Sequence, residues 1–146
     1  MSGASADELE AAVRAGEALA AGDRFARLLG MRLETVRPGY ARVTMPVTDE
    51  LLNAVGTTHG GATFALADFA FAVASNSRGR SAVALAAQIS YPAASTVGDT
   101  LCAEAVEESL GGRTALYRVE VRRVDGGLTG LFTGTVYRTR DPLPGA

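Results

Sequence analysis

One acidic side chain interrupts an otherwise apolar run of the chain. Asp68 lies within residues 62–74, whose other members are alanine, phenylalanine, leucine, valine and one threonine. A carboxylate without a partner in such surroundings is costly to bury, or its pKa rises. We interpret Asp68 as a general base or nucleophile in a dry cleft. The alternative is a carboxylate that faces a solvent-filled seam or bonds to neighbouring backbone.

The run opens with His59-Gly60-Gly61, which is a poor helix start because glycine loses much backbone entropy on folding. Two glycines leave the N–H groups at the positive end of the helix unshielded by side chains. Such N–H groups suit an oxyanion or a carbonyl oxygen. A flexible loop-to-helix junction would explain the glycines, but it would not explain the carboxylate downstream.

The spacing of these residues predicts a dimer. Asp68 follows Gly60 by eight residues, which is roughly 12 Å along a helix at about 1.5 Å per residue. An attacking group and an oxyanion donor must both lie within roughly 3 Å of one reacting centre. Two antiparallel copies of the helix meet this requirement, with Asp68 of one chain near Gly60 of the other. A two-fold dimer with two identical sites follows.

The elements that must position these residues are one long helix and a sheet. Residues 60–76 are apolar all round, which predicts a helix buried on every side. Pro38-Gly39 between two alternating runs predicts a hairpin, and after Gly79 the hydrophobic period becomes two. That period predicts strands over 83–91, 100–110, 113–124 and 128–138. We expect an α+β domain in which an antiparallel sheet of about six strands wraps around the helix.

The ends of the chain are assigned to separate segments. Ser5 and Glu8 have capping-box spacing and open a helix whose apolar stripe we expect at Leu9, Ala12, Val13 and Leu19. The expected organisation is a helical extension over 1–22, the main domain over 23–138 and a loose tail over 139–146.

Composition limits the function classes. The chain has 146 residues, a net charge of -2 and fourteen basic residues that are all arginine, so we expect no nucleic-acid partner. A single cysteine, Cys102, excludes an internal disulfide or a cysteine-cluster metal site, and a single histidine excludes sites that need two. No signal peptide or membrane span is expected, so the predicted location is the cytoplasm.

A longer motif carries a family resemblance. Residues 53–61, Asn-Ala-Val-Gly-Thr-Thr-His-Gly-Gly, are followed after six residues by Asp68 and then by Phe69-Ala70. This pattern, together with residues 74–79 and 131–135, resembles the hotdog-fold acyl-CoA thioesterases. The most similar group is the PaaI-like branch of phenylacetic-acid degradation, and the resemblance spans about residues 25–138.

The resemblance implies roles for the motif residues. The Gly60 N–H would polarise the thioester carbonyl, Gly61 would shape the helix start, and Asp68 of the partner chain would activate water or attack directly. Asn53 would position water or the thioester, unless it caps its own turn. His59 would orient the loop or contact the carbonyl. Some relatives hold the water with a Ser or Thr on the next strand, where this chain has Ala84.

The resemblance also implies a substrate and an assembly. The substrate would be an acyl-CoA, with phenylacetyl or hydroxyphenylacetyl as the family-level acyl group and medium fatty acyl chains still open. No separate cofactor or metal is expected, because CoA is part of the substrate. The implied assembly is a homotetramer of two dimers. Candidate acyl-pocket residues are Leu52, Phe64 and Phe71, and candidate ligands of the CoA phosphates are Arg78, Arg80 and Arg113.

Two other function classes remain in play. The first is a non-catalytic acyl-CoA-binding module, which Ala84 favours and the costly Asp68 carboxylate disfavours. The second is an acyl thioester hydratase or dehydratase. Such enzymes usually pair His and Asp about five residues apart, whereas His59 precedes Asp68 by nine.

Overall fold

The expected α+β architecture is confirmed. The structure is a computed structural model that describes residues 3–146. Within those residues one antiparallel sheet of six strands has the order β1-β2-β4-β5-β6-β3. The elements are α1 (Ala6–Gly22), α2 (Arg24–Leu28), β1 (Arg32–Arg37), β2 (Tyr40–Pro46), the 3-10 turn η1 (Asp49–Leu51), α3 (Gly60–Asn76), β3 (Arg80–Ser90), β4 (Thr100–Leu110), β5 (Thr114–Arg123) and β6 (Leu128–Pro142).

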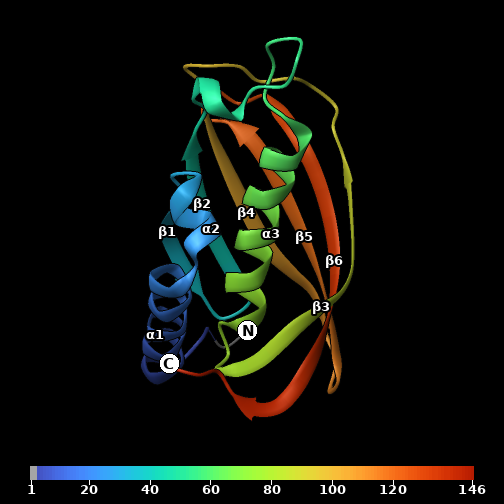
Figure 1. Cartoon of the computed structure of the whole chain (residues 1–146). Helices are drawn as coiled ribbons and strands as arrows, with labels where there is room; N and C mark the ends of the chain where they lie inside the picture. Colours follow the sequence, from blue (N-terminus) through green and yellow to red (C-terminus); the bar gives the residue numbers. More distant parts are fainter. Residues whose placement is uncertain (1–2) are drawn as a thin grey trace.

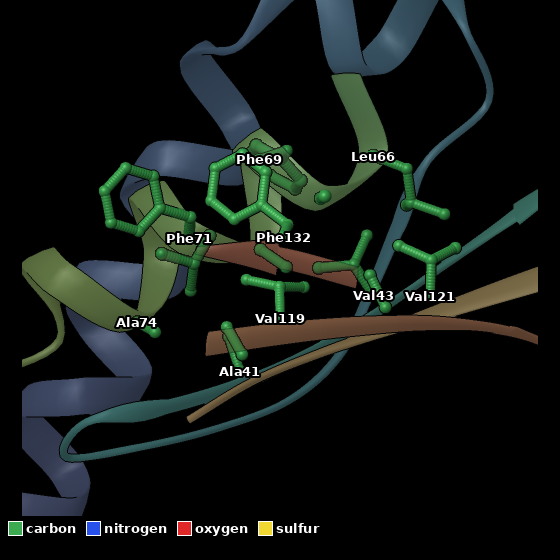
Figure 2. Close-up of a cluster of buried hydrophobic side chains, with 14 of the residues drawn as sticks. Ala41, Val43, Leu66, Phe69, Phe71, Ala74, Val119, Val121 and Phe132 are labelled. Carbon is green, nitrogen blue, oxygen red and sulfur yellow. The ribbon is translucent and has the colours of Figure 1, made fainter. Parts of the chain in front are cut away.

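Helix α3 lies along one face of the curved sheet, with α1 and α2 beside it (Figure 1). Its buried face meets the inward side chains of the strands, including Val43, Val119 and Phe132 (Figure 2). The ring of Phe71 lies 5.3 Å from that of Phe132, measured between centroids. A Cβ at Gly134 on β6 would lie 2.7 Å from the Phe71 ring, so this glycine makes room for the helix. The helix is thereby held firmly against the sheet.

The N-terminal helix has the predicted cap but a different buried face. Ser5 Oγ accepts the Glu8 N–H at 3.2 Å, and Glu8 Oε2 accepts the Ser5 N–H at 2.8 Å. The buried residues of α1 are Ala12, Ala15 and Gly16, whereas Leu9 and Val13 are about two-fifths exposed. The predicted stripe is therefore confirmed at Ala12, which is buried, and at Leu19, which packs against the core, and it is wrong at Leu9 and Val13. A Cβ at Gly16 would lie 2.9 Å from Val36 Cγ1, so small residues let α1 approach β1 closely.

The end of the chain is not a loose tail. Strand β6 continues through Thr139 to Pro142, and the Leu143 N–H donates to the Gly79 carbonyl at 2.9 Å. The predicted boundary at residue 139 is therefore four residues too early. The sequence did not reveal the extension because prolines at 142 and 144 are typical of irregular chain, and Pro142 sits at the strand terminus, where proline is tolerated.

Strand β3 forms one edge of the sheet, because it pairs with β6 alone. Most residues of β3 are exposed, including Val83 at 52% and Leu85 at 60%.

In the residues described, no helix is long and apolar enough to cross a bilayer.

Candidate active site

The first turn of α3 leaves one backbone donor unpaired. His59 is the N-cap, and its Nδ1 accepts the Gly61 N–H at 2.8 Å. The N–H groups of Ala62 and Thr63 both donate to the His59 carbonyl, at 2.9 and 3.3 Å. Among residues 3–146, the Gly60 N–H donates no hydrogen bond. This donor points from the positive end of the helix and is available to a ligand oxygen.

Asn53 organises the loop that precedes α3. Its Oδ1 accepts the N–H groups of Val55 and Thr57 at 3.0 and 3.1 Å, and its Nδ2 donates to Thr57 Oγ1 at 2.9 Å. The side chain therefore caps its own turn, which is the alternative that the sequence left open. It also lines a cavity of about 440 Å³ beside Gly60. The other residues lining this polar cavity are Thr57, Thr58, Thr63, Tyr91, Pro92, Ala93, Ala94, Ser95 and Thr129.

Asp68 lies two turns further along α3 and lines a different cavity. This cavity measures about 300 Å³ and is mainly apolar, with Asp23 as the second acidic residue in its wall. The Asp68 carboxylate has no hydrogen-bond or ion-pair partner in the part of the chain that the structure describes. Burial raises its pKa above the ordinary aspartate value, and the negative charge of Asp23 adds to the rise. A carboxylate in this state is a stronger base than one in water.

One chain does not bring Asp68 and Gly60 together. Asn53 and Gly60 line the polar cavity, whereas Gly61, Phe64 and Asp68 line the apolar one. Because α3 is a regular helix throughout, the two groups remain separated by roughly 12 Å of helix. A single chain therefore does not place both groups on one bond.

The remaining candidates for acyl binding divide between the site and the core. Phe64 lines the Asp68 cavity and its ring lies 5.5 Å from that of Phe132. Leu52 forms an isolated bridge with Thr58 at the base of the loop. Phe71 is 1% exposed and packs against Phe132 and Tyr117 in the core, so it lines neither cavity.

The three candidate arginines lie near the other end of α3. Arg78 forms a two-bonded ion pair with Glu107, at 2.9 and 3.2 Å. Burial alone would raise the pKa of Glu107, but hydrogen bonds from Arg78 and Tyr117 outweigh it and lower that pKa. Arg80 donates to the Thr139 carbonyl at 2.8 Å. None of the three, Arg113 included, lines either cavity.

Sequence reasoning missed three residues at these cavities. Tyr91 donates its O–H to the Gly60 carbonyl at 2.9 Å, although the two residues are 31 positions apart. Asp23, the N-cap of α2, and Phe25, in its first turn, line the same cavity as Asp68. Asp23 is the N-cap of α2, and its Oδ1 accepts the Ala26 N–H at 2.9 Å. The proximity of these groups to the site depends on topology.

Comparison with known proteins gives a consistent result. The model of the thioesterase superfamily matches residues 55–129. A putative esterase of Archaeoglobus fulgidus is 45% identical over 122 residues, which cover 84% of this chain and 79% of that protein. The acyl-coenzyme A thioesterase PaaI of Escherichia coli is 38% identical over 123 residues, which cover 84% of this chain and 88% of PaaI.

Solved structures agree with these relatives. The structure of E. coli PaaI, a protein from the phenylacetic acid degradation operon, superposes with a TM-score of 0.90 at 36% identity. The match covers 92% of this chain and 97% of PaaI. A hypothetical thioesterase of Streptococcus pneumoniae, solved with coenzyme A, matches with a TM-score of 0.73 at 28% identity. That match covers 75% of this chain and 86% of the streptococcal one.

Proposed function

The chain belongs to the thioesterase superfamily, as a hotdog-fold thioester hydrolase of the PaaI-like branch, and from this premise we propose that it cleaves acyl-CoA thioesters. The observation that carries the proposal is the unpaired Gly60 N–H on a helix that also bears the unpaired Asp68 carboxylate. Proteins similar to this chain support the choice of substrate, because one is named an acyl-coenzyme A thioesterase and another was solved with coenzyme A.

We propose that the working unit is a homodimer with antiparallel α3 helices. The outer face of α3 carries Gly61, Phe64, Ala65 and Ala72 around Asp68, and this apolar face is incompletely covered in a single chain. The β3 edge is likewise unpaired and apolar. A second copy that covers both surfaces supplies the missing carboxylate to each Gly60. A tetramer of two such dimers follows from the family resemblance.

The proposed reaction divides the chemistry between two chains. The thioester carbonyl oxygen accepts the Gly60 N–H, and the helix dipole stabilises the negative charge that develops on it. Asp68 of the partner takes a proton from water as the water oxygen attacks the carbonyl carbon. The C–S bond then breaks, the acid is released, and the CoA thiolate takes up a proton. In the alternative route the Asp68 carboxylate attacks the carbonyl carbon, the C–S bond breaks and the CoA thiolate leaves and takes up a proton, and water then hydrolyses the mixed anhydride to the free acid and the Asp68 carboxylate.

Asn53 and His59 take supporting roles in this proposal. His59 holds the Gly61 N–H, so it orients the helix start. Asn53 uses its Oδ1 on the loop, and its Nδ2 bears a second hydrogen that faces no acceptor among the described residues. That hydrogen is suited to hold the attacking water or the thioester.

The proposed acyl group is aromatic, either phenylacetyl or hydroxyphenylacetyl. The cavity beside Asp68 is lined by Phe25, Met31, Phe64 and Phe69, and aromatic rings pack favourably against such walls. Medium fatty acyl groups are the alternative substrates. A binding module without catalysis is the alternative function, and it leaves the unpaired Asp68 carboxylate without a purpose.

The test is CoA release from a panel of aromatic and straight-chain acyl-CoA esters. We expect Asp68→Asn to lower kcat by about a thousandfold or more, since it removes the base or nucleophile. Asp125→Asn, on an exposed turn, is the matched control and should retain wild-type rates. Equal rates in the wild type and Asp68→Asn would remove Asp68 from the mechanism. Binding of esters without any hydrolysis would establish the binding module instead.

A further inference from the structure

The peptide between Gly60 and Gly61 is held on both sides by side chains. Its N–H donates to His59 Nδ1 at 2.8 Å, and its carbonyl accepts the Tyr91 O–H at 2.9 Å. Glycine is the residue with the greatest backbone freedom, so two in succession would otherwise leave the helix start loosely defined. The two hydrogen bonds fix the plane of this peptide from opposite edges.

We propose that Tyr91 is a positioning residue that, together with His59, aims the Gly60 N–H at the substrate carbonyl. The inference rests on the proposed function, since it assigns Tyr91 a part in the same site. Tyr91 comes directly after β3 and lines the polar cavity beside Asn53 and Gly60. It therefore ties the N-terminus of α3 to the end of the edge strand.

The same side chain explains why residue 60 has no Cβ. Gly60 does not have a positive φ, so its backbone conformation is open to other residues. A Cβ at this position would lie 3.3 Å from both Cζ and Oη of Tyr91. The contact is tighter than ordinary packing, so an added methyl group would push the phenol away and strain its hydrogen bond. The phenol of Tyr91 thus occupies the space that a Cβ at residue 60 would need.

The first test is Tyr91→Phe, which keeps the ring and removes the hydroxyl. We expect kcat for CoA release to fall about fivefold, the effect of one lost hydrogen bond, with KM within about twofold of wild type. We also expect faster hydrogen–deuterium exchange in a peptide that contains residues 59–61, because the glycines become less ordered. Tyr40→Phe is the matched control, because it removes a tyrosine hydrogen bond to Glu104 on another part of the sheet.

The two readouts separate the possible failures. An unchanged kcat in Tyr91→Phe would overturn the positioning role, as would a lower kcat with unchanged exchange at 59–61. An equal fall of kcat in Tyr40→Phe would mean that the loss reflects general destabilisation, and it would also overturn the positioning role of Tyr91. If the wild type hydrolyses no ester, the proposed function fails, and the exchange measurement alone then decides whether Tyr91 orders the helix start.

A double-mutant cycle tests the close contact between residue 60 and Tyr91 independently. We expect Gly60→Ala to lower kcat more in the wild-type background than in the Tyr91→Ala background. In the second background the Tyr91 ring, against which the added methyl group would press, is absent. Equal effects of Gly60→Ala in both backgrounds would show that Tyr91 does not set the space at residue 60.

Discussion

The unpaired N–H of Gly60 belongs to the backbone, so ordinary substitutions leave it in place. Proline is the exception, because it has no N–H and is well tolerated at the first position of a helix. His59, the preceding residue, has φ -58° and ψ 133°, which is the extended conformation that proline requires before it. The N–H can therefore be removed with little change to the helix.

We expect Gly60→Pro to lower kcat about a hundredfold, the effect of losing one oxyanion donor, with only a small change in Tm. Gly60→Ala is the control, because it adds bulk near Tyr91 but keeps the N–H. CoA-release kinetics and thermal unfolding measure the two quantities. If Gly60→Ala and Gly60→Pro lose activity equally, bulk and not the donor accounts for the loss.

The pKa of Asp68 offers a second test at the residue scale. Burial and the charge of Asp23 both raise this pKa, and the base acts only when deprotonated. Asp23→Asn removes the charge and keeps an oxygen to cap α2. The loss of the Asp23 charge should lower the pKa of Asp68, so the acidic limb of the kcat profile should move to lower pH.

Asp99→Asn is the matched control for this pH measurement. Asp99 likewise accepts a backbone N–H three residues away, from Thr96, but it does not line the Asp68 cavity. The acidic limb of the kcat profile of Asp99→Asn should coincide with that of the wild type. A limb that stays in place or moves to higher pH in Asp23→Asn would contradict the assignment of Asp68 as the base.

At the scale of elements, the proposed dimer depends on the β3 edge, which pairs with β6 alone within one chain. Leu85 is 60% exposed, so Leu85→Lys should leave the folded chain intact. We expect it to weaken self-association at least about tenfold, because a lysine on an apolar edge opposes strand pairing between copies. Analytical ultracentrifugation measures the change, with CoA release falling in parallel at low protein concentration.

Val124→Lys is the control for the edge substitution, since Val124 is 65% exposed on the turn between β5 and β6. It should associate as the wild type does. Unchanged association of Leu85→Lys would exclude β3 as the pairing edge.

Most elements could be predicted from the sequence because their periods differ clearly. Residues 60–76 and 100–110 have the predicted bounds, since each is a continuous pattern between breakers. The buried face of α1 was mispredicted at Leu9 and Val13 because close packing against β1 favours the small Gly16. Strand β6 was cut short because pairing with β3 extends it into a segment of weak pattern.

The candidate site was predictable only where its residues are close in sequence. Asp68 and Gly60 stand out because a charge and two glycines contradict an apolar helix. Tyr91 contributes through a contact that exists only once β3 ends beside the start of α3. No local pattern signals such a contact, so a sequence pattern alone did not predict it.

At the scale of the whole molecule, the proposed site exists only in the assembly. A single chain keeps Asp68 and Gly60 in separate cavities, and a rigid helix between them prevents their approach. The proposed dimer of antiparallel helices would hold two sites, each with Gly60 from one chain and Asp68 from the other. Inactive variants of the two residues should therefore complement each other.

The decisive measurement is CoA release by a mixed dimer of Asp68→Asn and Gly60→Pro chains, co-expressed with different affinity tags and purified through both. One of its two sites contains both substitutions and the other contains neither, so we expect about half of the wild-type activity per dimer. Each variant alone should keep no more than about one hundredth of the wild-type activity under the same conditions. A mixed dimer as inactive as its parents would show that each site draws Asp68 and Gly60 from the same chain, contrary to the proposed mechanism.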